Sequence, residues 1–261
     1  MANYWSADVL YHNLGNGAFE EWTPGGVDVR DNGRSRPLAW GDYDGDGDPD
    51  LFVGRDTPNC DLLFRNNGDS TFTDVTGTTT FYARTRRTIT AAWFDYDLDG
   101  LLDVYVGHNE NLVCNTGQQF TANSLYRNKG GGVFEDVISA TGGDGRNTYA
   151  LVPVDFDNDG DIDLFLGSDG ATGGGGAGCS GTDVLHKNNG DGTFTDITTS
   201  AGVGGGENGD DVNTYGGSSA DINGDGNMAR RSSAEHLIAT KALRCTATAR
   251  ILIVAESFAN F

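Results

Sequence analysis

Apolar and acidic segments alternate along the chain in a fixed order. Three times, an apolar stretch is followed by Asp-x-Asp-x-Asp-Gly and then by a second apolar stretch, and these copies end at Gly54, Gly107 and Gly167. A fourth, partial copy (SSADINGDGN) ends at Asn227. The apolar flanks are rich in β-branched and aromatic residues, which favours strands over amphipathic helices. Each copy therefore predicts a strand, an acidic loop and a returning strand.

A second motif alternates with the acidic loops. Leu is followed by Asn three positions later, by Gly five positions later and by Phe nine positions later. Its four copies begin at Leu10, Leu63, Leu125 and Leu185. Each copy predicts a hairpin with Asn and Gly in its turn. We expect the Phe of each copy to lie in the core: Phe19, Phe72, Phe134 and Phe194.

The spacing of the acidic loops predicts the fold class. The loops begin at Asp42, Asp95, Asp155 and Asp221, at intervals of 53, 60 and 66 residues. Each interval holds two hairpins, and four antiparallel strands per repeat make a propeller blade. The predicted fold is all-β: a β-propeller of four-stranded blades, with about three complete blades and two half-blades. We interpret it as a fragment of a larger propeller.

The segment 228–261 differs from everything before it, because it contains no Gly and no Asp. Ser232-x-x-Glu235 can open a short helix as a capping box, and Ile251–Val254 can form a strand. We interpret the segment as an atypical tail that is foreign to the repeat, for example through an error of reading frame; native closing sequence is the alternative. The predicted domains are therefore the blades, 1–227, and the tail, 228–261.

The charge of the chain narrows the choice of partners. Asp and Glu outnumber Lys and Arg by 38 to 17, which gives a formal net charge of −21. This charge argues against nucleic acid and anionic membranes as partners, because their phosphates would be repelled. No apolar run approaches the ~20 residues that a membrane helix needs. Because the carboxylates crowd into short loops, they repel one another unless a cation neutralises them.

The cysteines and the first residues indicate the cellular compartment in which the protein is expected to occur. The four cysteines have neither CxxC nor zinc-finger spacing, and three disulfide connectivities are possible if all of them pair. They are Cys60, Cys114, Cys179 and Cys245. Such bridges fit an oxidising compartment. The sequence opens without a basic segment and an apolar segment, so its start is not a signal peptide. We expect a secreted protein whose signal was removed, or a start internal to a longer protein.

The acidic loops carry the predicted chemistry. Side chains at positions 1, 3, 5 and 9 are expected to converge on a cation, because a tight loop turns alternate side chains inward and Gly at position 6 permits the bend. The backbone carbonyl of position 7 completes the set. In loop one these residues are Asp42, Asp44, Asp46, Asp50 and, at position 7, Asp48. In loop two they are Asp95, Asp97, Asp99, Asp103 and, at position 7, Leu101. In loop three they are Asp155, Asp157, Asp159, Asp163 and, at position 7, Asp161. Oxygen ligands in this number favour Ca²⁺ over Mg²⁺.

A fourth loop offers a weaker ligand set. It contains Asp221, Asn223 and Asp225, but position 9 is Ala229. We therefore expect three calcium sites and a fourth, degenerate one. An EF-hand shares the Asp-x-Asp-x-Asp-Gly opening, but its bidentate Glu at position 12 is missing. Those positions hold Val53, Val106, Leu166 and Ser232.

The two motifs together, as in GDYDGDGDPDLFVG and LYRN-x-G-x-x-x-F, resemble FG-GAP/VCBS repeats over Leu10 to Asn227. Such repeats build the propeller of integrin α-subunits, and the pairing of the motifs looks especially like the ASPIC/UnbV-associated, cartilage-acidic-protein version. The resemblance implies a calcium-stabilised extracellular propeller, usually of seven blades, that acts in adhesion or ligand binding. By that count this chain is about three blades short.

The leading functional hypothesis is a calcium-binding adhesion or ligand-binding module for a protein or glycan of the cell surface or matrix. The alternatives are a lectin-like propeller, with Trp22, Trp40 and Trp93 at its rim or else in its core, and an accessory domain of a carbohydrate-active enzyme. An enzyme would use Asp pairs as acid and base. However, aspartates committed to a metal are poor general acids, and an active site usually occurs once. We therefore expect no enzymatic activity.

Overall fold

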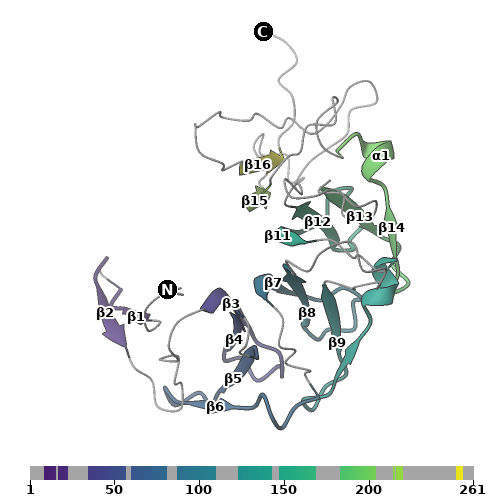
Figure 1. The fold of residues 1–261 in the computed structure, drawn as a ribbon. Coiled ribbons are helices and arrows are strands. Elements are labelled where there is room, and N and C mark those ends of the chain that lie inside the picture. The colour runs from purple at the N-terminus through teal and green to yellow at the C-terminus, as the bar shows by residue number, and fades with distance from the viewer. Residues whose placement is uncertain are drawn as a thin grey trace. The chain divides into compact units, whose positions relative to one another are not determined.

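A computed structural model gives the architecture of the chain (Figure 1). It describes residues 9–15, 17–22, 35–56, 60–80, 87–109, 123–142, 147–168, 183–203, 214, 216–219 and, for the backbone alone, 251–254. Within these ranges the chain forms three four-stranded antiparallel sheets, one antiparallel hairpin and one parallel strand pair. In each four-stranded sheet, strands that are neighbours in sequence are also neighbours in space.

The four-stranded sheets are the predicted blades. The first contains β3 (Ser35–Gly41), β4 (Asp50–Arg55), β5 (Leu62–Asn66) and β6 (Phe72–Asp74). The second contains β7 (Thr88–Phe94), β8 (Asp103–His108), β9 (Ser124–Asn128) and β10 (Phe134–Asp136). The third contains β11 (Thr148–Val154), β12 (Asp163–Ser168), β13 (Val184–Asn188) and β14 (Phe194–Asp196). The all-β class and the blade architecture of a partial β-propeller are confirmed.

The second strand of each blade is the most deeply buried element. In β4, Leu51 and Val53 pack into one cluster with Leu10 and Phe72, whereas Phe52 packs into another. Alternate side chains point to opposite faces of a strand, so both faces of β4 are covered. This explains the continuous apolar run after each acidic loop, because a strand buried on both faces shows no polar alternation.

The chain also contains a half-blade at its beginning. β1 (Leu10–Asn13) and β2 (Phe19–Trp22) pair as an antiparallel hairpin. The prediction of four core phenylalanines holds for Phe72, Phe134 and Phe194, which are 4%, 5% and 8% exposed. It is wrong for Phe19, which is 60% exposed. The buried phenylalanines pack against aromatic residues such as Trp22, Tyr43 and Tyr96, respectively. The described residues place no such partner over Phe19.

Helical structure is limited to two short turns in the described ranges. The 3₁₀ turn η1 (Ile138–Thr141) follows β10, and α1 (Thr198–Ala201) follows β14. Each ends at a glycine in the left-handed region, Gly142 and Gly202, a common helix terminator. Neither flanks an acidic loop, as the exclusion of an EF-hand requires. None of the described helices is long and apolar enough to cross a membrane.

The C-terminal part contributes one strand to the described structure. β15 (Gly216–Ser219) pairs with β16 (Ile251–Val254) in parallel, with Gly216 opposite Ile251. The strand predicted at Ile251–Val254 is therefore present, although pairing inside the blades is antiparallel. The helix considered at Ser232 lies outside the described residues. Cys60 lies within the described ranges and has a free thiol. The other three cysteines lie outside the described ranges.

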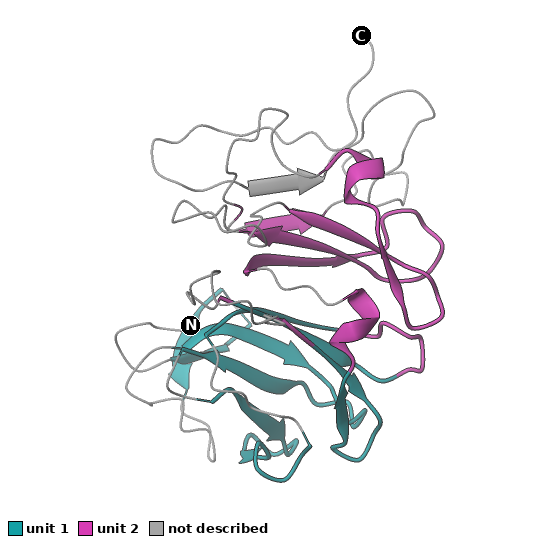
Figure 2. Cartoon of the chain, turned by 45° about the vertical axis from the view of Figure 1, so that its right-hand side comes forward, with its two compact units in different colours: residues 1–93, 101–108, 125–136 teal, residues 94–100, 109–124, 137–261 magenta. Residues whose placement is uncertain are grey.

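Contacts divide the chain into two compact units, which Figure 2 colours separately. Unit 1 comprises Met1–Trp93, Leu101–His108 and Leu125–Asp136. Unit 2 comprises Phe94–Gly100, Asn109–Ser124 and Val137–Phe261. Unit 1 thus holds the half-blade, the first blade and most of the second blade. Unit 2 holds the third blade and the acidic loop between β7 and β8. In every side-chain contact described below, both residues belong to the same unit.

Candidate metal centre

Each acidic loop is wrapped around its first carboxylate. In loop one, Asp42 accepts hydrogen bonds from the backbone N–H groups of Gly45, Asp46 and Gly47 at 2.8, 3.1 and 2.9 Å. The backbone has φ of 75° at Gly45 and 95° at Gly47, in the region that glycine adopts without strain. The loop is therefore tight enough to bring its alternate side chains to the same side.

The other loops repeat this wrapping with different residues. Asp95 accepts from the N–H groups of Asp99 and Gly100 at 3.1 and 2.9 Å. Position 4, which is Gly45 in loop one, is Leu98 in loop two and Asn158 in loop three, and both have positive φ, at 57° and 60°. A leucine in this conformation is unusual. The carboxylate at position 1 and the glycine at position 6 therefore set the loop shape even where position 4 is not glycine.

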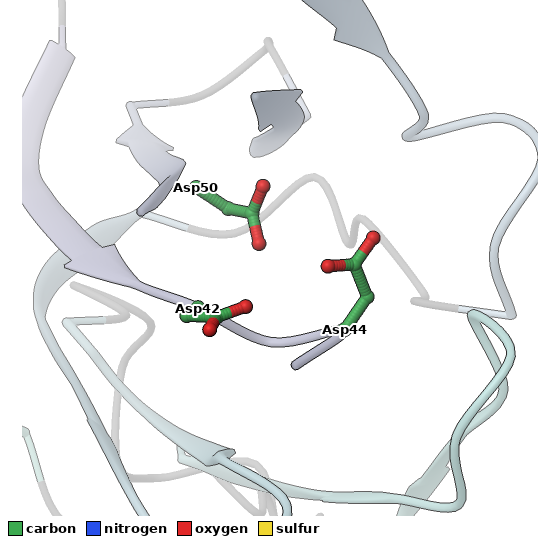
Figure 3. A group of neighbouring side chains, drawn as sticks. All are labelled: Asp42, Asp44 and Asp50. Atoms are coloured by element: carbon green, nitrogen blue, oxygen red, sulfur yellow. The ribbon is translucent and has the colours of Figure 1, made fainter. Parts of the chain in front are cut away.

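Three carboxylates converge in each described loop, and one oxygen of each lies within 4.8 Å of the other two. The three groups are Asp42, Asp44 and Asp50; Asp95, Asp97 and Asp99; and Asp155, Asp157 and Asp163. Figure 3 shows the loop-one carboxylates facing one common space. Positions 1 and 3 are thus brought together in all three loops, and position 9 joins them in loops one and three.

The carboxylate at position 9 has a second role that sequence reasoning missed. Asp50 is fully buried and accepts the backbone N–H groups of Tyr43 and Asn66 at 3.0 and 2.8 Å. Asp163 does the same with Phe156 and Asn188, at 3.0 and 2.8 Å. This residue therefore ties the acidic loop to the third strand of the same blade.

Asp103 makes the corresponding tie in the second blade. It is fully buried and accepts the N–H group of Asn128 at 2.7 Å. The carboxylates that converge in loop two belong to positions 1, 3 and 5 instead. The interstrand tie of position 9 is thus common to all three blades, whereas its place among the converging carboxylates is not.

Burial raises the pKa of two of the position-9 carboxylates, Asp50 and Asp163. Loss of hydration raises the pKa of Asp50 to about 6 and that of Asp163 to about 7, against the opposing effect of their N–H donors. Burial also raises the pKa of Asp44, and the neighbouring charges of Asp46 and Asp42 add to the rise. A group of this kind favours any positive partner, whether a proton or a cation.

The remaining predicted ligands have mainly local roles in the structure. At position 5, Asp46 accepts the N–H of Asp48 at 2.9 Å and Asp159 accepts the N–H of Asp161 at 3.1 Å, as in turns. At position 7, where a backbone carbonyl was predicted as ligand, Asp48 lies over Gly68 of the second motif. A β-carbon on Gly68 would lie 2.5 Å from the Asp48 carboxylate, and the φ of 73° at Gly68 is one that glycine adopts without strain.

The donor set fits a hard divalent cation. All ligand atoms that converge are carboxylate oxygens, the type that Ca²⁺ prefers. In loop three, one oxygen of Asp155 (Oδ1) is shielded from solvent and accepts no hydrogen bond from the described residues. A buried polar atom normally has a partner, and a cation would supply one here. The fourth predicted set, Asp221, Asn223 and Asp225, lies outside the described residues.

The asparagine of the second motif is the hub that connects loops to strands. Its backbone N–H binds the position-9 carboxylate, and its side-chain oxygen accepts the N–H of the glycine two residues later, as Asn128 does for Gly130 at 2.9 Å. Its side-chain NH₂ donates to the carbonyl of the acidic loop's position 8, here Leu102, at 3.1 Å. These bonds explain why Asn and Gly keep a fixed offset in the motif.

The same asparagine also reaches the loop of the preceding blade. Asn128 donates to the backbone carbonyl of Tyr43 and Asn188 to that of Tyr96, both at 2.7 Å. The tyrosine rings pack against the next blade's phenylalanine, with ring centroids 5.8 Å apart for Tyr43 and Phe134. The aromatic residue at position 2 of each acidic loop was the sequence signal for this contact.

A polar bond repeats between blades at the other end of the strands. The residue before the third strand binds a threonine of the next repeat. These bonds join Asp61 to Thr88, Asn123 to Thr148 and Asp183 to Thr214, at 2.9, 2.9 and 2.8 Å. Burial raises the pKa of Asp61 to about 7. The repeated Asp or Asn before the third strand and the Thr at the start of the next repeat were the available signals.

Comparison with known proteins gives the following. The family described as FG-GAP-like repeat matches residues 1–53, 42–106 and 107–166, more than half of the chain. The comparison with curated proteins gave no match. Among solved structures, a lectin of Agrocybe aegerita, described as recognising non-reducing terminal N-acetylglucosamine, is similar with a TM-score of 0.45 and 17% sequence identity. The alignment covers 74% of this chain and 46% of the lectin, so the chain spans less than half of that protein's length.

Proposed function

We propose that this chain, which belongs to the FG-GAP-like repeat family, binds Ca²⁺ through its acidic loops and uses the stabilised blades as an extracellular adhesion or ligand-binding module. The observation that carries the calcium proposal is the convergence of three carboxylates in each described loop. In loops one and three the buried carboxylates of Asp50 and Asp163 belong to the group.

The identity of the ion follows from the ligands. Ca²⁺ accepts six to eight oxygens in flexible geometry, whereas Mg²⁺ demands a regular octahedron and keeps most of its water. The loops offer carboxylates from positions 1, 3 and 9 or 5, and peptide carbonyls and water would supply the remaining ligands of Ca²⁺. In loop one we assign the ion to Asp42, Asp44 and Asp50, and in loop three to Asp155, Asp157 and Asp163.

The expected effect of the ion is stabilisation. A ligand that binds only the folded state contributes RT ln(1 + [Ca²⁺]/Kd), about 1.4 kcal/mol per site at ten times Kd. Three independent sites would supply about 4 kcal/mol, a large share of the ~5–15 kcal/mol of a typical domain. Calcium would also remove the repulsion among the carboxylates of each loop. Its role is therefore to order the loops that join the first two strands of each blade.

The acidic groups suit binding better than catalysis. In every described loop the carboxylates face one another and the backbone N–H groups of their own loop, and the arrangement recurs with each blade. A net charge of −21 favours a cationic or neutral partner over an anionic one. We therefore propose a protein or glycan ligand at the cell surface or in the matrix, and no catalytic activity.

Thermal unfolding tests the calcium proposal. Calcium is expected to raise the melting temperature relative to EGTA, and Mg²⁺ at equal concentration to raise it less. Asp44→Ala should reduce the calcium-induced rise by about a third, because it removes one of three sites. Asp69→Ala is the control, since Asp69 is exposed in the β5–β6 turn, where it accepts the backbone N–H of Thr71. An identical melting temperature in calcium and EGTA would refute the proposal.

The ligand proposal needs a separate experiment. A glycan array and an array of matrix proteins, both probed in calcium and in EGTA, should show binding that is lost in EGTA. Binding to glycans alone would favour the lectin-like form of the function, and binding to proteins alone the adhesion form. Equal binding with and without calcium would show that ligand binding does not depend on calcium in the acidic loops.

A further inference from the structure

Loop three contains a cation of its own, the side chain of Lys187. Lys187 lies on β13, directly before the hub asparagine Asn188. Its ammonium group forms ion pairs with Asp157 and with Asp159, the latter at 2.8 Å. Asp157 is one of the three carboxylates that converge in this loop. The amine therefore contacts the group of oxygens that would hold a metal ion.

The first blade differs at the matching position. Arg65 precedes the hub asparagine Asn66 as Lys187 precedes Asn188. Its guanidinium donates to the side-chain oxygen of Asn67 at 3.5 Å, and it affects the Asp44 carboxyl only as a nearby charge. Two blades with the same fold thus place their basic side chains differently toward the acidic loop.

We propose that Lys187 is a built-in counter-cation of loop three, which must leave Asp157 before a divalent cation can bind there. This inference rests on the proposed calcium binding and deepens it, because it ranks the sites. Loop three then binds calcium more weakly than loop one and depends less on calcium for its order. Lys187 thus lowers the calcium affinity of this site.

The physical reason is a competition between two cations for the same oxygens. The ammonium group of Lys187 pairs with Asp157, one of the converging carboxylates, and with Asp159, so the amine and a metal ion need the same oxygens. Lys187 is about one third exposed, so water screens the pair and the amine can be displaced. While the Lys187 amine occupies the site, calcium cannot bind there. The apparent calcium affinity of loop three is therefore reduced in proportion to the fraction of molecules in which the site is free. For a pair of this exposure, we expect a reduction of about two- to fivefold.

The test isolates loop three. In a chain that carries Asp44→Ala and Asp97→Ala, calcium binding by calorimetry reports loop three alone among the three described loops. Adding Lys187→Met should tighten the Kd about two- to fivefold. Lys187→Arg, which keeps the charge, should stay close to the parent. Arg65→Met in the same background removes one positive charge at the matching position of blade one and should leave the Kd of loop three unchanged.

A second readout does not need calcium. In EGTA, Lys187→Met should lower the melting temperature of the otherwise unmodified chain by a few degrees, because Asp157 and Asp159 lose their counter-charge. Lys187→Arg, which keeps the charge, should leave the melting temperature close to that of the unmodified chain. Arg65→Met should have a smaller effect.

The two readouts separate the inference from the proposed function. If the unmodified chain binds no calcium, the proposed function fails, while the melting temperatures in EGTA still test the counter-cation. An unchanged or weaker Kd after Lys187→Met, together with an unchanged melting temperature in EGTA, would overturn the role of Lys187.

Discussion

The side-chain amide of Asn188 donates a hydrogen bond of 2.7 Å to the backbone carbonyl of Tyr96, across 92 positions in sequence. Asn128 makes the same bond to Tyr43, also at 2.7 Å. Each asparagine thus connects the end of its own third strand to the acidic loop of the blade before it. These asparagines therefore link the conformation of each acidic loop to the packing of the next blade.

We expect Asn188→Ala to lower the free energy of unfolding by about 1–3 kcal/mol, because the carbonyls of Tyr96 and Ile162 lose the hydrogen bonds that Asn188 donates. Urea unfolding in EGTA measures this. Asn13→Ala is the matched control. Asn13 has the same motif position, but it is exposed, and its side-chain oxygen accepts the local N–H of Gly15. An equal loss in both variants would contradict the interblade role of the asparagine.

Asp61→Asn is predicted to stabilise the protein at high pH. Asp61 accepts the N–H of Arg55 and the hydroxyl of Thr88, and burial raises its pKa to about 7. In the next blade Asn123 takes this place and donates to Thr148, so an amide fits the interaction.

The sign of the pH effect follows from the raised pKa of Asp61. The unfolded carboxyl has a pKa near ~3.9, so the folded state binds more protons between pH ~4 and pH ~7. Stability therefore falls as pH rises through this window, and the penalty is complete above it. Asp61→Asn should flatten this fall and gain up to about 4 kcal/mol at pH 8, since the pKa is raised by about three units and one unit corresponds to about 1.4 kcal/mol. Denaturant unfolding from pH 4 to pH 8 measures it, and a parallel pH profile in both proteins would contradict it.

Gly54→Ala is expected to destabilise the first blade. A β-carbon at Gly54 would lie 2.5 Å from a ring carbon of Pro37 and 2.6 Å from the methyl group of Thr88. Overpacking of this kind costs about 1–3 kcal/mol. Gly77→Ala is the control, because a β-carbon at Gly77 would meet no atom within 4 Å, and a change within about 0.5 kcal/mol is expected. Thermal unfolding compares the two, and equal effects would show that the close approach is not limiting.

Calcium affinity should weaken as pH falls below 7. The pKa values of Asp50 and Asp163 are raised to about 6 and about 7, and a carboxylate must lose its proton to bind a metal ion. Protons therefore compete with calcium in loops one and three, and the Kd at pH 5.5 should be several-fold higher than at pH 7.5. Calorimetry at the two pH values measures this. Equal affinities would mean that Asp50 and Asp163 are not among the ligands.

The regular part of the fold was predictable from the sequence because it depends on local patterns. Strand, acidic loop and strand recur with a fixed spacing, and the glycine at position 6 marks the bend, as Gly47 does with φ of 95°. The same spacing predicted that Asp42 and Asp44 would converge, because alternate residues of a tight loop face the same side.

The rest depends on partners that are distant in sequence. The double role of Asp50 requires the N–H of Asn66, which is 16 positions away. Phe19 is exposed because no described residue packs over it as a distant partner does over the other three phenylalanines. Lys187 pairs with Asp159 of loop three, which is 28 positions away. A periodic pattern identifies the repeat, but it does not show which copies of the repeat contact each other or how.

The number of calcium ions bound per chain tests the central claim most directly. Isothermal titration of the chelator-treated protein at pH 7.5 should give three ions for loops one to three, with loop three weaker than loop one. Asp44→Ala, Asp97→Ala and Asp157→Ala should each remove about one ion, whereas Asp225→Ala, in the degenerate fourth loop, should remove none. A titration that detects no bound calcium would contradict the proposed role of the acidic loops.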